Sequence, residues 1–107
     1  MGKYVFVVQS EPTEGNEDAY NDWYDNVHLG EVLTVPGFVA AQRFKVQDGS
    51  EGLQYLALYE LDTDDPQASL AALGAGIKAG DIHMSDAING PTIQSTMYGP
   101  IGERMTA

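Results

Sequence analysis

The chain has 107 residues, 43% of them hydrophobic, and carries 16 Asp and Glu against five Lys and Arg, a formal charge of −11. This composition predicts one folded domain, residues 1–107, and an acidic surface that repels nucleic acids and anionic membranes. The absence of cysteine excludes a disulfide framework, a thiol nucleophile and a thiolate metal site. No apolar run approaches the roughly 20 residues of a membrane span. With no signal peptide in view, we expect a cytoplasmic protein.

The expected secondary structure alternates strands and helices. The elements are strands at Lys3–Ser10, Phe38–Gln47, Leu53–Leu61 and Thr92–Tyr98, and helices from about Glu17 to Val32 and from about Pro66 onward. Residues 79–91 are expected to be irregular or briefly helical. The order β-α-β-β-α-β predicts the ferredoxin-like α+β fold, a four-stranded antiparallel sheet with two helices on one face.

Sequence signals also place the ends of the helices. Asn16 is a plausible N-cap for the first helix, and Pro36-Gly37 ends it. Asp65 can cap the second helix, whose end Gly74 and Gly76 are expected to weaken.

The first and third strands are apolar on both faces. In the first strand Val5 and Val7 alternate with Tyr4, Phe6 and Val8. Two helices cover only one face of a four-stranded sheet, so the other face needs a cover of its own. We expect a homodimer with sheets packed face to face. The alternative, a monomer with scattered surface apolar residues, explains one or two such positions but not two whole strands.

Aromatic residues and a histidine share one side of the first helix. Tyr20, Tyr24 and His28 follow at i, i+4 and i+8, and Trp23 and Val27 flank them. In one interpretation Tyr20, Trp23 and Val27 form the core stripe, with His28 at its edge. In the other, His28 is an acid or base beside the aromatic wall of a pocket for a flat organic molecule.

The segment Trp23–Phe38 resembles the first-helix motif of EthD-like proteins, which belong to the dimeric α/β-barrel superfamily. The shared features are an aromatic pair, a histidine four residues later and a Pro-Gly-Phe entry to the second strand. Many relatives carry proline two residues after the histidine, where this chain has Gly30. The resemblance implies a dimeric α/β barrel. It leaves the function open, because the superfamily includes monooxygenases, cyclases, isomerases and haem-degrading enzymes.

The resemblance also implies a ligand cleft between the helices and the sheet. Trp23, Tyr24 and His28 would line one wall, and His83 follows the second helix in a region where similar enzymes place working residues. His83 can equally be an exposed loop residue. The further ligand-binding candidates are Tyr20 on the helix and Tyr55, Tyr59 and Tyr98 on the strands, whose facing depends on strand register.

The chemistry is narrowed by motifs that the sequence lacks. There is no metal-ligand spacing, no phosphate-binding glycine loop and no Ser-His-acid context. The remaining hypothesis is a cofactor-independent enzyme, an isomerase, cyclase or monooxygenase, in which His28 moves a proton while a tyrosine stabilises an oxyanion. A non-catalytic protein that binds a hydrophobic ligand is the alternative. A haem-binding protein with His83 as axial ligand comes third, because the tryptophan that haem-degrading relatives carry near the second helix is missing here.

Overall fold

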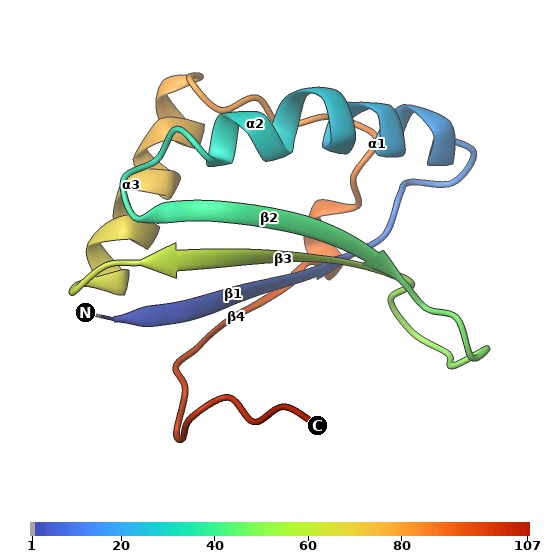
Figure 1. Ribbon diagram of the computed structural model, residues 1–107. Coiled ribbons are helices and arrows are strands. Elements are labelled where there is room, and N and C mark those ends of the chain that lie inside the picture. Colours follow the sequence, from blue (N-terminus) through green and yellow to red (C-terminus); the bar gives the residue numbers. More distant parts are fainter. Residues whose placement is uncertain (1) are drawn as a thin grey trace.

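A computed structural model describes residues 2–107 and contains one antiparallel sheet with its helices on one face (Figure 1). The strands are β1 (Lys3–Ser10), β2 (Phe38–Lys45), β3 (Tyr55–Asp62) and β4 (Gln94–Tyr98). They pair in the order β2-β3-β1-β4. This confirms the ferredoxin-like β-α-β-β-α-β fold. In the same residues no helix is long and apolar enough to cross a bilayer.

The first helical stretch is continuous but changes its winding in the middle. It consists of α1 (Glu17–Trp23), a π-helical turn η1 (Tyr24–His28) and α2 (Leu29–Val32). The predicted bounds of this helix are confirmed. The predicted cap is not formed, because the Asn16 amide donates to the Thr13 hydroxyl at 2.8 Å and leaves the helix end without a side-chain cap.

The second helix is longer than its glycines suggested. α3 spans Pro66–Ala79, and the Asp65 carboxylate caps it by accepting from the Ala68 amide at 3.0 Å. The helix passes through Gly74 and Gly76 and ends at Gly80, whose φ of +85° is typical of a helix C-cap. Gly76 has a packing role, since a Cβ there would lie 3.0 Å from the Ile82 side chain. A short 3₁₀ turn, η2 (Gly90–Thr92), precedes β4.

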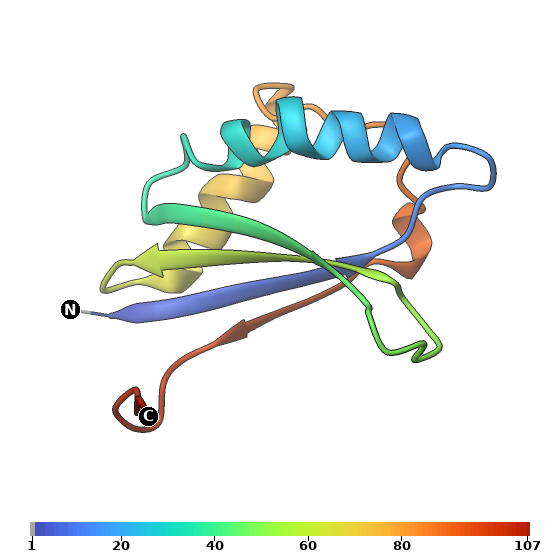
Figure 2. The ribbon, with the colours of Figure 1, turned by 45° about the vertical axis from the view of Figure 1, so that its right-hand side comes forward.

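The core lies between the sheet and the helices (Figure 2). Phe6 on β1 pairs with Tyr59 on β3, and both rings contact Phe38 on β2 at centroid distances of 6.4 and 5.9 Å. Gly37, just before β2, has φ +96°, and a Cβ there would lie 2.3 Å from the Ser69 hydroxyl of α3. Glycine at this position therefore allows α3 to pack against the start of β2.

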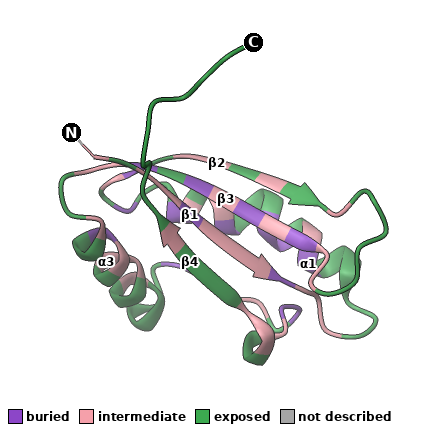
Figure 3. Ribbon diagram, turned by 90° about the horizontal axis from the view of Figure 1, so that it is seen from below, coloured by how far each residue is buried: buried purple, intermediate pink, exposed green. Residues whose placement is uncertain are grey.

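The opposite face of the sheet has no cover from within residues 2–107 (Figure 3). Val5 pairs with Tyr98 and Val7 with Leu58 on this face. Val39, Phe44 and Tyr98 are 59%, 46% and 52% exposed. Residues 99–107 leave β4 on this side of the sheet (Figure 1). We call this surface the open face.

Candidate functional site

The π turn in the first helix brings Trp23 and His28 together. In an α-helix two residues five apart are rotated by about 140° around the axis. In a π turn they are one turn apart and share a side. The two rings accordingly stack, with centroids 4.4 Å apart and planes inclined by 28°. The Tyr24 ring meets His28 edge-on at 5.3 Å. Val27, expected in the core stripe, is 37% exposed.

A cavity of about 170 Å³ lies between this helix, the sheet, α3 and the residues after α3. Its wall is mostly apolar, and among the described residues that line it His28 is the sole one with a basic side chain. The lining residues are Phe6, Val8, Tyr24, His28, Val32, Tyr59, Leu73, Ile77, Met84, Ile88, Ile93 and Ser95. The structure therefore brings together Tyr24, His28 and Tyr59 from the expected set.

Two buried polar atoms of the lining residues lack a hydrogen-bond partner. They are Nδ1 of His28 and the hydroxyl of Tyr59, and they are the only such side-chain atoms in the described part of the chain. A buried polar group without a partner costs about 1–3 kcal/mol. Such groups are rare in folded proteins and call for an explanation, of which a ligand is one.

Burial sets the protonation state of these groups. Desolvation lowers the pKa of His28, partly offset by the backbone carbonyl of His83 and by Glu31, so the neutral ring is favoured. Burial raises the pKa of Tyr59, and the neighbouring Tyr24 adds to this effect, so its hydroxyl stays protonated. Desolvation also raises the pKa of Tyr24. The cavity thus presents a neutral imidazole and phenol groups that keep their protons.

His83 lies outside the cavity. Its Nδ1 is 2.7 Å from one carboxylate oxygen of Glu31, and its backbone N–H donates to the other oxygen at 2.7 Å. The His83 backbone carbonyl accepts from the indole Nε1–H of Trp23 at 3.0 Å. The imidazole is 68% exposed. Its position fits the exposed-loop interpretation, with a specific partner in Glu31.

The other predicted tyrosines do not line the cavity. Tyr20 is fully buried and shares a 2.6 Å hydrogen bond with the Ser10 hydroxyl. Tyr55 donates its hydroxyl to Glu17. Tyr98 lies on the open face, because its register with Val5 turns it away from the helices. Trp23 supports the site from behind His28 without lining the cavity.

Arg43 supports the aromatic wall from the β2 side. Its guanidinium lies 4.6 Å from the centroid of the Tyr24 ring and donates to Asp25 and Asn21 at 2.8 Å each. Sequence reasoning missed Arg43, Glu31 and Met84. Simple alternation from Phe38 would place Arg43 on the opposite face, and a register shift between Phe38 and Ala40 turns it toward the helix. No local signal marked Glu31 or Met84, because their roles depend on the path of residues 81–89.

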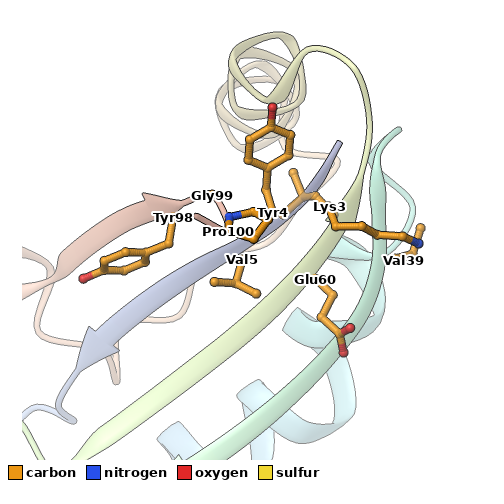
Figure 4. Close-up of a pocket in the computed structure, with 9 residues that line it drawn as sticks. Lys3, Tyr4, Val5, Val39, Glu60, Tyr98, Gly99 and Pro100 are labelled. Atoms are coloured by element: carbon orange, nitrogen blue, oxygen red, sulfur yellow. The ribbon is translucent and has the colours of Figure 1, made fainter. Parts of the chain in front are cut away.

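A second hollow lies on the open face (Figure 4). It has a volume of about 270 Å³ and is lined by residues of all four strands, Val5, Val39 and Tyr98 among them, and by Gly99 and Pro100 after β4. Although it is larger, its lining includes none of the unpartnered buried polar atoms. The cavity at His28 is therefore the stronger candidate for a ligand site. Across residues 2–107, no three His, Asp or Glu side chains are placed to hold a metal ion.

No family model and no curated protein matches the sequence, but solved structures match the fold along nearly the whole chain. The haem-degrader MhuD of Mycobacterium tuberculosis has a TM-score of 0.67 at 17% identity, over 95% of this chain and 99% of that chain. The cofactor-independent oxygenase SnoaB of Streptomyces nogalater scores 0.60 at 15% identity, over 96% and 97%. An EthD family protein of Bacillus halodurans scores 0.59 at 16% identity, over 98% and 100%. The resemblance to EthD-like proteins is thereby confirmed for the fold, the ferredoxin-like α+β fold.

Proposed function

We propose that this protein is a cofactor-independent enzyme that transfers a proton to or from a small, flat, neutral substrate of aromatic or polyketide-like type. In this proposal Nδ1 of His28 accepts the proton and the Tyr59 hydroxyl donates a hydrogen bond to the oxygen that becomes negative. Tyr24 forms the wall between them. The observation that carries the proposal is that two residues lining this mostly apolar cavity, His28 and Tyr59, each have a buried polar atom without a hydrogen-bond partner. The fold shared with a cofactor-independent oxygenase supports a monooxygenase type of reaction.

The protonation states fit these roles. A neutral imidazole is ready to accept a proton, and its lowered pKa suits substrates whose own proton is moderately acidic, such as phenols and 1,3-dicarbonyl compounds. A phenol that keeps its proton can stabilise an enolate or phenolate through a hydrogen bond that strengthens as charge develops. One acid–base group of this kind contributes about 10²–10⁴-fold in rate.

The cavity also limits the size and charge of the substrate. Its volume of about 170 Å³ is below the roughly 300–1,000 Å³ of sites for drug-sized ligands, which favours one- or two-ring molecules. Neither lysine nor arginine is among the described residues that line it, so phosphate or carboxylate groups would lack a counter-charge. The imidazole of His83, the axial ligand in the haem-binding hypothesis, contacts Glu31 and does not line this cavity. The haem-binding hypothesis therefore gains no support from the site.

A homodimer remains part of the proposal. The open face presents Val39, Phe44 and Tyr98 to solvent, and exposed apolar patches of this kind mark association surfaces. A second copy is the occupant that we propose, with the two open faces in contact. Sedimentation velocity at micromolar concentration tests this. A dimer is the expected result, and a Val39→Asp variant should dissociate it, whereas a monomeric wild type would overturn the proposal.

The test of function is an NMR titration of both imidazoles with and without a panel of one- and two-ring phenols and lactones. We expect ligands to shift the His28 resonances and leave those of His83 nearly unchanged. Activity with a ligand that binds should be lost in His28→Gln and kept in Asp18→Asn, a change at an exposed position of the same helix. Binding without turnover, unaffected by His28→Gln, would indicate the non-catalytic ligand-binding protein instead. Two histidines that respond to no ligand would refute both functions.

A further inference from the structure

The residues after α3 close one side of the cavity, and they are attached at two separate places. We call residues 81–89 the closing loop. Its second half is tied to residues 11–13, since Ala87 accepts from the Thr13 amide at 2.7 Å and the Asn89 amide donates to Glu11 at 3.0 Å. Its first half begins after Gly80, which has φ +85°, and contributes Met84 to the cavity wall.

The first half of the loop is held to α3 by Ile82, which is buried in the core beside Gly76, and its hydrogen bonds to the first helix come from His83. Both donors of His83, its backbone N–H and its ring, meet the Glu31 carboxylate at 2.7 Å, and its carbonyl accepts from the Trp23 indole at 3.0 Å. We call these three contacts the latch. An exposed ion pair alone contributes little, but a carboxylate that also accepts from a backbone N–H fixes the direction of the chain.

The latch reaches the reactive ring through one side chain. The indole that donates to the His83 carbonyl is the ring stacked on His28 at 4.4 Å. The same carbonyl also raises the pKa of the His28 ring. A displacement of His83 would therefore release Trp23, hydrate the His28 ring and move Met84 at the edge of the cavity.

From this geometry we propose that Glu31 and His83 are positioning residues, which hold the first half of the closing loop shut and fix Trp23 and His28 for proton transfer. The inference rests on the proposed function for the role of His28. The latch itself is a property of the folded chain and can be tested without a ligand. It assigns His83 a place in the site different from direct participation in the reaction.

The test uses the full chain and three variants: Glu31→Ala, which removes both carboxylate contacts; Glu31→Gln, which keeps an acceptor for the His83 N–H; and Asp18→Asn, a control on the same helix. Trp23 is the only tryptophan, so its indole N–H gives one NMR signal. We expect Glu31→Ala to speed exchange of this proton by about tenfold or more, as for loss of a hydrogen-bonded contact. The titration of His28 should shift as well, because Glu31 and the His83 carbonyl both act on the pKa of this ring, and Glu31→Gln should give a smaller effect.

The outcomes separate the latch from the function. If Glu31→Ala is folded and leaves both indole exchange and the His28 titration as in wild type and Asp18→Asn, the latch is refuted. If Glu31→Ala does not fold, the same two signals in Glu31→Gln and His83→Ala decide. With 2-naphthol as the probe, weaker binding in Glu31→Ala supports the latch. If wild type binds neither 2-naphthol nor any other phenol, the result counts against the proposed function. The indole exchange rates still test the latch in that case.

Discussion

Tyr59→Phe is the substitution for which stability and activity should change in opposite directions. The Tyr59 hydroxyl is buried without a partner, and the folded state bears the desolvation cost of about 1–3 kcal/mol. Replacing Tyr59 by phenylalanine removes only this oxygen and keeps the ring that packs against Phe6 and Phe38. We expect the free energy of unfolding to rise by about 1 kcal/mol, or the melting temperature by roughly 4 °C or more.

Activity should fall in the same variant. If the hydroxyl donates to a developing oxyanion, its loss should lower kcat by about 10²–10³-fold, the effect of removing one such donor. The assay is turnover of whichever phenol or lactone binds, together with urea unfolding followed by circular dichroism. A ligand that binds through this hydroxyl should stabilise wild type more than Tyr59→Phe, and should therefore reduce the stability difference between the two proteins.

Tyr20→Phe is the matched control. Tyr20 is also a fully buried tyrosine, but its hydroxyl is bonded to Ser10 at 2.6 Å. Its removal leaves the serine without that partner, and the free energy of unfolding should fall by about 1–2 kcal/mol. If Tyr59→Phe destabilised the protein as much as Tyr20→Phe, the Tyr59 hydroxyl would have a protein partner after all. The argument for a ligand site at Tyr59 would then be refuted.

Three further predictions concern pH, backbone geometry and the aromatic wall. Burial lowers the pKa of His28 below 6.5, so below that pH the unfolded chain binds a proton that the folded chain resists. The free energy of unfolding should therefore decrease as the pH is lowered below about 6.5, by up to about 1.4 kcal/mol per pH unit. In urea titrations at pH 5.5–7.5, His28→Gln should abolish this slope. Gly37→Ala should lower the free energy of unfolding by about 2–4 kcal/mol and Gly49→Ala by about 1 kcal/mol. Both glycines have positive φ, but of the two only Gly37 has a close neighbour. Equal losses of stability in thermal melts would contradict the packing role of Gly37. Arg43→Met should lower the free energy of unfolding by about 1–2 kcal/mol through loss of its contacts with Tyr24 and its two hydrogen bonds, whereas a loss below 0.3 kcal/mol would show that the guanidinium does not support the wall.

The fold could be predicted because its signals are local and repeated. The runs of apolar, β-branched and aromatic residues in β1 and β3, the proline and glycine after the first helix and the Asp65 cap each act within a few residues. Together they leave few topologies other than the observed one.

The site could be predicted only in part, because it depends on register and on one irregular turn. The placing of Tyr59 in the cavity and of Tyr98 on the open face follows from strand pairing, which the sequence left open. The exposure of Val27 and the stacking of Trp23 on His28 follow from the π turn, and an analysis with a 3.6-residue period assumes that such a turn is absent. The Glu31–His83 contact spans 52 positions and has no local signature.

The winding of η1 also behaves as a one-residue insertion in the helix. A helix that accommodates an extra residue has two segments whose faces are offset by about 100°, the rotation per residue of an α-helix. Deleting Val27, the outward residue of that turn, would restore regular winding. Only one of the two helix segments would then still direct its apolar face toward the sheet. Either Tyr20 and Trp23 or Val32 and Val35 would have to leave the core. Any alignment of this chain with a relative whose helix is regular therefore needs a gap within Tyr24–His28. Any graft of the His28 site onto another scaffold must carry that extra residue with it.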